Sequence, residues 1–168
     1  MIILGIDPGL RSTGYGIIDA LPSQHRVIAA GDIRPRAWEP LAARLAFLHA
    51  SLAALIMRHR PDTAVLEKLF THHAHVTTAA LMAHARGVAC VTVQEQGLML
   101  AEYPPTQVKQ SLTGNGHASK EQVARMVAAR LGVREARWSF DATDALALAI
   151  VHTHLMMQRE RLPAGVAR

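Results

Sequence analysis

Four acidic residues stand apart from the other acids of this chain because of where they occur. Two directly follow apolar runs typical of buried strands, residues 2–6 and 63–66, and two lie three positions apart on one face of a predicted helix. The four are Asp7, Glu67, Asp141 and Asp144. Oxygen ligands without a nearby thiolate suit hard cations such as Mg²⁺ or Mn²⁺. Two such ions, roughly 3.5–4 Å apart, can activate a water and stabilise the leaving oxygen when a phosphodiester bond is cut.

Each of these acids also has an ordinary structural interpretation. Asp7 begins the common turn sequence Asp-Pro-Gly, and Asp141 could cap the start of a helix. A single acidic residue would therefore favour the structural interpretation. Four carboxylates in one place, however, repel each other unless cations neutralise them. Two strand ends combined with a helical pair therefore favour a metal centre.

The first half of the chain contains the elements that would bring two of these acids together. The predicted elements are strands at 2–6, 14–18 and 26–33, a helix at 41–60 and a strand at 63–66. The first three strands form an antiparallel meander. If the fourth strand lies parallel to the first, a right-handed crossover is expected, and both strands end at the same edge of the sheet. Asp7 and Glu67 are then neighbours.

The second half of the chain completes an α/β pattern. The predicted elements are a helix at 77–94, a strand at 98–103 and helices at 106–112, 120–131 and 140–159. Residues 88–93 could extend as a strand instead, and Ser119 with Gln122 forms a helix-capping pattern. The order predicts a five-stranded mixed sheet flanked by helices. We expect a single nuclease domain at 1–160 and a flexible tail at 161–168.

Composition limits the function only broadly. The 168 residues carry 18 Lys and Arg against 13 Asp and Glu, a formal charge of +5 that permits a polyanionic partner and equally a solvated surface. The one cysteine, Cys90, rules out a disulfide within the chain and is expected to be a small buried hydrophobe. No leader pattern and no uninterrupted apolar stretch of membrane-spanning length occurs, so we expect a cytoplasmic protein without a membrane partner.

Five segments of the chain resemble one protein family. They are residues 4–16 (LGIDPGLRSTGYG), 67–70 (EKLF), 85–89 (ARGVA), 103–120 (with VKQ and GNG) and 141–147 (DATDALA). In this order they are similar to the RuvC family of Holliday-junction resolvases, which has a ribonuclease H-like fold. The resemblance extends from residue 2 to about residue 155.

The resemblance implies a metal-dependent endonuclease that cuts two strands of a four-way DNA junction symmetrically during recombination and repair. It implies a homodimer, two Mg²⁺ (or Mn²⁺) ions per active site, and partnership with the RuvA–RuvB branch-migration complex. It makes the four acids the metal ligands and places Lys109 and Lys120 near the cleaved phosphate as further catalytic residues. Phe70 would stack on an unpaired base near the crossover, and Arg86 would contact DNA.

The segment after the second acidic motif departs from the family pattern. It contains His72, His73 and His75, which we expect to belong to a DNA-facing loop. Their spacing is poor for a closed zinc site and no cysteine is near, so a transition-metal site is less favoured. His84 and Thr143 also depart from the family, while the four acids are all present. Because two symmetric cuts need two sites related by a two-fold axis, we expect a dimer contact, which we place at residues 78–85.

Three other functions remain open at the level of the sequence. A ribosomal-RNA-processing nuclease of the same fold would be shorter and would have a different opening turn. An actin-like phosphate binder also begins with a strand followed by Asp-x-Gly, but it needs two domains to close over a nucleotide. A junction-binding protein without catalysis would not need all four acids.

Overall fold

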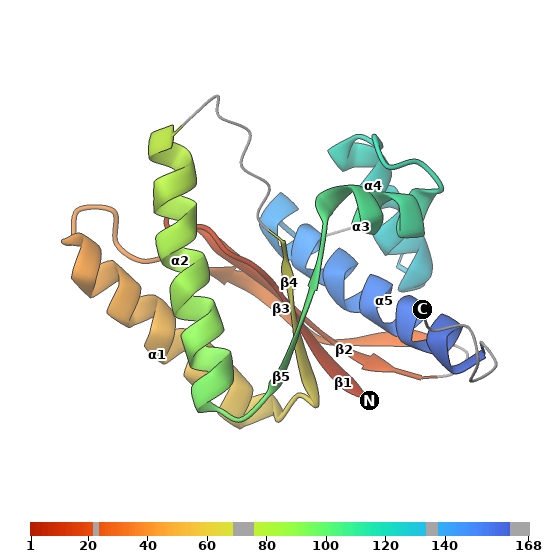
Figure 1. The fold of residues 1–168 in the computed structure, drawn as a ribbon, viewed down its shortest axis with the longest axis horizontal. Coiled ribbons are helices and arrows are strands. Elements are labelled where there is room, and N and C mark those ends of the chain that lie inside the picture. The colour runs from red at the N-terminus through yellow and green to blue at the C-terminus, as the bar shows by residue number, and fades with distance from the viewer. Residues whose placement is uncertain (22–23, 69–75, 134–137, 162–168) are drawn as a thin grey trace, which may run out of the picture.

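The computed structural model describes residues 1–21, 24–68, 76–133 and 138–161. The strands are β1 (Ile2–Asp7), β2 (Thr13–Ala20), β3 (His25–Ile33), β4 (Thr63–Glu67) and β5 (Met99–Tyr103). The helices are α1 (Leu41–His59), α2 (Val76–Glu95), α3 (Pro105–Thr113), α4 (Lys120–Arg130) and α5 (Phe140–Arg161). Figure 1 shows these elements around one twisted sheet.

The strands form a five-stranded mixed sheet in the order β3-β2-β1-β4-β5. Strands β1, β2 and β3 are antiparallel, whereas β4 pairs in parallel with both β1 and β5. The predicted meander, the parallel pairing of the first and fourth strands and the α/β class are confirmed.

Two details of the predicted elements differ in the structure. Residues 88–93 lie inside α2 rather than in a strand, because Ala85, Ala89 and Val93 recur at helical spacing and form its buried stripe. Arg161, which we assigned to the tail, is the last residue of α5, and residues 162–168 lie outside the described part of the chain.

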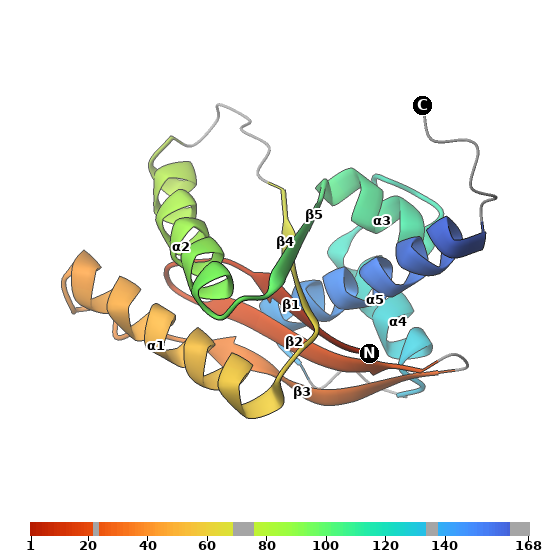
Figure 2. The ribbon, with the colours of Figure 1, turned by 60° about the horizontal axis from the view of Figure 1, so that its bottom comes forward.

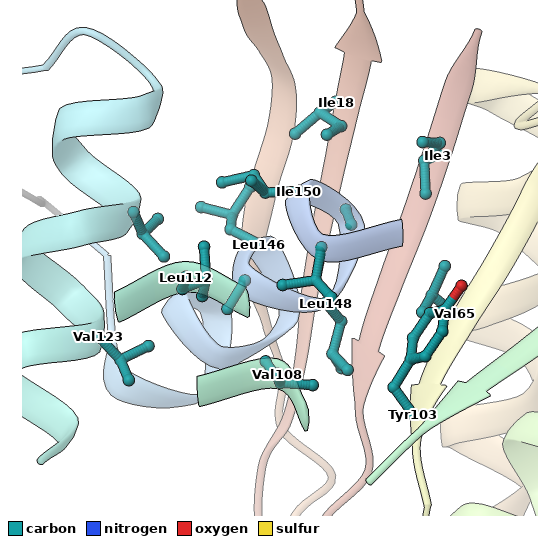
Figure 3. Packing of buried hydrophobic residues seen from close by; sticks show 14 of the residues in the cluster. Ile3, Ile18, Val65, Tyr103, Val108, Leu112, Val123, Leu146, Leu148 and Ile150 are labelled. Atoms are coloured by element: carbon teal, nitrogen blue, oxygen red, sulfur yellow. The ribbon is translucent and has the colours of Figure 1, made fainter. Parts of the chain in front are cut away.

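Helices cover both faces of the sheet, which therefore has two hydrophobic cores. Helices α1 and α2 lie on one face, and α5, flanked by α3 and α4, lies on the other (Figure 1, Figure 2). Successive residues of β1 alternate between the cores, since Ile3 packs with the α5 side and Leu4 with the α1 side. This double burial explains why β1 is apolar along its whole length. Figure 3 shows the α5 side, where Leu146 and Ile150 pack near Ile18.

Helix α5 lies directly against the backbone of β1 and β2 because three facing strand residues lack side chains. A Cβ atom at Gly5 would collide with the backbone of Ala145, and one at Gly14 would collide with the backbone of Asp141. A Cβ at Gly16 would meet the Leu146 side chain and backbone. The glycines therefore set both the height and the position of α5 above the sheet.

Helix α1 is the one helix among the described residues that is long and apolar enough, by length and composition alone, to cross a membrane. Its buried stripe of Leu48, Leu52 and Ile56 packs on the sheet in the α1-side core. Core helices of soluble proteins pass the same test of length and composition. Its other faces carry exposed apolar side chains, including Phe47, which is 47% exposed.

The contact between α5 and the strand glycines makes a stability prediction. We expect Gly5→Ala to lower the free energy of unfolding by about 1–3 kcal/mol, because the added methyl group collides with helix backbone that can move only as a unit. The measurement is urea unfolding. Gly87→Ala in α2 is the control, since nothing lies within 4 Å of its added Cβ, and it should leave stability unchanged or raise it by up to about 1 kcal/mol. Equal stability of the two variants would contradict the close contact.

Candidate active site

Two of the four acids meet at one edge of the sheet. Asp7 is the last residue of β1 and Glu67 is the last residue of β4. The two strands run parallel with Ile6 opposite Leu66, so both chains leave the sheet at the same level. The predicted neighbourhood of Asp7 and Glu67 follows from this register.

The other two acids reach the same place from α5. Asp141 lies in the first turn of that helix and Asp144 one turn later. Because the backbone of Asp141 lies over Gly14, the strand partner of Asp7, the helix starts beside the end of β1. A cleft of about 400 Å³ is lined by all four acids and by Lys109 and Lys120.

A serine two residues before Asp141 fixes the start of α5. The Ser139 hydroxyl accepts a hydrogen bond from the Ala142 amide at 3.0 Å and donates one to a carboxylate oxygen of Asp32 at 2.5 Å. Asp32 is in register with Gly14 and Asp7 across β3, β2 and β1. Ser139 is therefore the helix cap, and Asp141 is not needed for capping, which settles one of the ordinary interpretations of that residue.

The two lysines come from helices on the α5 side of the sheet. Lys109 lies on α3, and Lys120 is the first residue of α4. The predicted capping box of α4 is present, since the Ser119 hydroxyl accepts from the Gln122 amide while the Gln122 side chain accepts from the Ser119 amide. The Lys120 ammonium lies 3.7 Å from a carboxylate oxygen of Asp144, so it partly compensates the acids.

The acids are held in an environment that disfavours their charge. Burial, followed by repulsion from Asp144, Glu67 and Asp141, raises the pKa of Asp7 to about 7. Burial and the Asp144 charge raise the pKa of Glu67 above its ordinary value. Burial is also the main cause that raises the pKa of Asp144, against the opposing effect of Lys120. The cleft therefore concentrates negative charge that a bound cation would relieve.

The donor set fits a hard divalent cation in an open site. Among residues 1–21, 24–68, 76–133 and 138–161, no group of three or more Asp, Glu, His or Cys side chains is arranged to hold a metal ion by itself. A cation in the cleft would therefore need water or substrate oxygens to complete its ligands. Mg²⁺ suits such a site because it retains waters and takes substrate phosphate as a ligand. The cleft also contains the buried Ser12 hydroxyl, which has no hydrogen-bond partner among these residues.

The remaining predicted site residues lie elsewhere. The Arg86 side chain is 18% exposed, forms an ion pair with Glu102 of β5 and donates to the Cys90 sulfur at 3.4 Å. Arg86 does not line the cleft, and its visible contacts join α2 to β5. Phe70, His72, His73 and His75 lie outside the described residues.

Sequence reasoning missed Ser12, Ser139 and Asp32. Ser12 lies in the turn after Asp7, and its position five residues after a predicted ligand was the available signal. The contact between Ser139 and Asp32 joins residues 107 positions apart, so no local sequence pattern predicts it.

Comparison with known proteins places the chain in a family. The family model described as crossover junction endodeoxyribonuclease RuvC matches residues 3–152. The chain belongs to the RuvC family. A RuvC protein of Paramagnetospirillum magneticum is 46% identical over the full length of both chains. The RuvC protein of Moorella thermoacetica is 42% identical, with 98% of this chain and 99% of the relative covered.

Solved structures agree with the RuvC assignment. Thermus thermophilus RuvC has a TM-score of 0.84 at 33% identity, covering 94% of this chain and 97% of that one. The same protein in complex with a Holliday junction substrate gives a TM-score of 0.86, with coverages of 94% and 96%. The yeast mitochondrial resolvase Ydc2, 12% identical with a TM-score of 0.67, shares the fold. RuvC membership decides against the RNA-processing nuclease and the actin-like phosphate binder.

The raised pKa of Asp7 predicts how the metal-free RuvC-family chain responds to pH. Protonated Asp7 suits the folded state better than ionised Asp7, so its stabilising contribution is present below its ordinary pKa of 3.8 and is lost as pH rises through about 7. Asp7→Asn removes the charge and should raise stability at pH 8.5 in EDTA by up to about 4 kcal/mol, but change it little near pH 4.

Urea unfolding across this pH range tests the prediction. Asp62→Asn is the control, because Asp62 accepts a hydrogen bond from the Ile2 amide at the opposite end of β1. If wild type and Asp7→Asn show the same pH dependence, the acids do not destabilise one another as described. Added Mg²⁺ should reduce the stability difference between wild type and Asp7→Asn at high pH, because a cation stabilises the ionised cluster.

Proposed function

We propose that Asp7, Glu67, Asp141 and Asp144 hold the divalent cations with which this RuvC-family endonuclease resolves Holliday junctions. One observation carries the proposal: four acids from two strand ends and one helix share a single cleft, and the pKa of three of them is raised. A charge cluster of that kind is costly in a fold and is typical of functional sites. Two ions per site, Mg²⁺ or Mn²⁺, match the number of carboxylates.

Each side chain of the cleft has a role that follows from its position. Bound cations would activate a water and stabilise the leaving oxygen of the phosphodiester. Asp7 has all three other acids among its charged neighbours. It is therefore placed to bind a cation together with Glu67 of β4 and a cation together with the acids of α5. Lys120, now paired with Asp144, can turn to a DNA phosphate once that acid binds a cation. Lys109 adds positive charge to the same wall, and the Ser12 hydroxyl can hydrogen-bond to a phosphate oxygen or a water.

Further parts of the proposal rest on the family resemblance. Phe70 follows Glu67 by three residues and would stack on an unpaired base at the crossover. The histidine segment at 72–75 would face the same DNA. We also propose that residues 1–160 act as one nuclease domain and that residues 161–168 form a flexible tail. The RuvA–RuvB complex is the proposed partner, and the cytoplasm the proposed location.

The metal-ligand proposal predicts separation of cutting from binding. Asp7→Asn should reduce the single-turnover rate on a synthetic four-way junction with Mg²⁺ by at least about 100-fold, because it removes a ligand and a charge from the cation site. Junction affinity measured in EDTA should stay the same or increase slightly, since one repulsive charge near the phosphates is lost. Asp62→Asn should cut at the wild-type rate.

Three outcomes would overturn this proposal. Cutting by Asp7→Asn at a rate near that of wild type would remove Asp7 from the ligand set. Equal cutting of a linear duplex and a four-way junction by wild type would remove the structural selectivity. Loss of both cutting and binding in Asp7→Asn, with an unchanged unfolding curve, would show that Asp7 acts in recognition rather than in catalysis.

We further propose that the protein works as a homodimer joined through α1 and α2. The exposed large apolar side chains of these helices are Leu41, Phe47, Met57, Leu81, Met82 and Val91. A groove of about 460 Å³ lies between the helices and is lined mainly by apolar residues, among them Leu45, Val88 and Val91. Exposed apolar surface of this kind is typical of a protein interface, and a two-fold axis would relate two active sites for two symmetric cuts.

The dimer proposal predicts that Val91→Glu dissociates the protein. Val91 is 52% exposed, so the substitution places a charge on the proposed interface while leaving the core intact. Sedimentation velocity should show wild type as a dimer and Val91→Glu as a monomer. Met99→Glu is the control, because Met99 is 76% exposed on the edge strand β5 and does not line the groove between α1 and α2. A dimeric Val91→Glu protein would place the interface elsewhere.

A further inference from the structure

A tryptophan stands in solvent in the loop between β3 and α1. Trp38 is 80% exposed, the largest exposed fraction among the large hydrophobic side chains of the described residues. The chain is poor in aromatic residues, at 4% of its composition, and its other tryptophan, Trp138, is partly buried against the core. An indole buries a large area when it finds a partner, and tryptophan is enriched where binding energy is concentrated.

One arginine contacts this tryptophan, and two more are exposed in its loop and in the turn after β1. The Arg36 guanidinium lies 5.9 Å from the Trp38 ring centroid, in cation–π contact, and its side chain is 71% exposed. Arg34, at the start of the same loop, is 65% exposed. Arg11 is exposed in the turn between β1 and β2. We call these four residues, Arg11, Arg34, Arg36 and Trp38, the arginine–tryptophan patch.

The arginine–tryptophan patch belongs to the same edge of the sheet as the cleft. Strand β3 leaves the sheet at Ile33, opposite Thr13, next to the row in which Asp7, Gly14 and Asp32 are in register. The Arg44 guanidinium, in the first turn of α1, donates to the Leu10 carbonyl at 2.8 Å. This bond joins the start of α1, which follows the Trp38 loop, to the turn that follows Asp7.

Ion pairs leave much of the positive charge of the patch available. Arg34 pairs with Asp32 at 2.8 Å, and Arg36 reaches Glu39 only at 3.9 Å. Both arginines are exposed, and the long Arg36–Glu39 pair contributes little. The Asp32 carboxylate is only 14% exposed, so Arg34 is held more firmly than Arg36. Among the described residues Arg11 has no recorded acidic partner, so three arginines face two acids.

We infer that the arginine–tryptophan patch is a second DNA-binding surface, which holds a duplex arm of the junction outside the cleavage cleft. The inference rests on the proposed function, because that function places the scissile phosphate at this edge of the sheet. Guanidinium groups match the geometry of backbone phosphates, and an indole can pack its apolar face on a sugar of that backbone. The contacts are to backbone rather than to base edges, so the surface adds affinity without sequence preference.

The chemistry of the patch favours DNA over a second copy of the chain. A protein interface would gather apolar side chains, whereas the exposed apolar side chains of α1 and α2, apart from Leu41, lie further along those helices. The described neighbours of Trp38 in its loop are Arg36, Ala37, Glu39 and Pro40, of which only Ala37 and Pro40 are uncharged. Aromatic side chains interleaved with arginines are typical of nucleic-acid surfaces.

Fluorescence of Trp38 gives a direct test. Trp138→Phe leaves Trp38 as the only tryptophan of the full-length chain, and its unfolding curve checks that the core is intact. Titration with a synthetic four-way junction in EDTA should quench or shift the Trp38 emission, and the change should saturate with the same midpoint as binding measured by anisotropy of labelled junction. Emission that does not respond at saturating junction would overturn the inference.

Affinity and salt dependence give a second, independent test. Trp38→Ala should weaken junction binding about 5- to 20-fold while the single-turnover cutting rate at saturating protein stays within about two-fold of wild type. Arg34→Ala with Arg36→Ala should lower the slope of log affinity against log salt by about two. Met99→Ala and Arg58→Ala are the controls, because Met99 is nearly as exposed as Trp38 and Arg58 lies at the opposite end of α1.

The outcomes separate this inference from the proposed function. A wild-type protein that does not cut junctions would refute the proposed function. The response of Trp38 emission to DNA would still test whether the patch binds DNA. Wild-type affinity and salt slope in both patch variants would overturn the inference with the proposed function intact. A shift of Trp38→Ala from dimer to monomer in sedimentation, with unchanged affinity per protomer, would make the patch a contact between copies and would also overturn it.

Discussion

The position of the active-site cleft depends on the contact between helix α5 and the backbone of β1 and β2. Gly5, Gly14 and Gly16 remove the side chains that would hold the helix away, so Asp141 and Asp144 start at the level of the strand ends. Ser139 then fixes the first turn through Asp32. A helix raised by one side-chain layer would carry the same two acids out of reach of Asp7. Close packing without side chains is therefore what turns three separate elements into one site.

This arrangement opposes stability at the place where it serves function. Burial and mutual repulsion raise the pKa of Asp7, Glu67 and Asp144, which means that the ionised cluster costs free energy in the folded state. The two cores on either face of the sheet offset that cost, since β1 is buried on both sides. On the proposed assignment, a bound cation would relieve the repulsion that the lysines leave uncompensated. The same repulsion that weakens the fold would then favour metal binding.

Sequence patterns predicted the elements and the grouping of acids because those depend on local rules. Apolar runs mark the strands, and the right-handed crossover places Glu67 beside Asp7. Contacts between distant residues were not predictable in this way: the Asp32–Ser139 bond and the Arg86–Glu102 pair depend on which helix face meets which strand. The expectation that Arg86 contacts DNA came from the family resemblance. In the structure its guanidinium pairs with Glu102, a contact between α2 and β5 that the motif alone does not predict. The assignment of the acids to metal stays a prediction.

A cleft lined by four acids poses an electrostatic problem for a DNA-cutting protein, because it repels the phosphates that it must receive. Lys109 and Lys120 offset part of that repulsion inside the cleft, but Lys120 is already engaged with Asp144. Further binding energy can come from positive charge placed outside the cleft. The formal charge of +5 makes such placement possible, and the arginines beside Trp38 lie at the correct edge. On the two proposals, different residues cut the DNA and hold it, so the acids could be adapted to cations without loss of affinity for DNA.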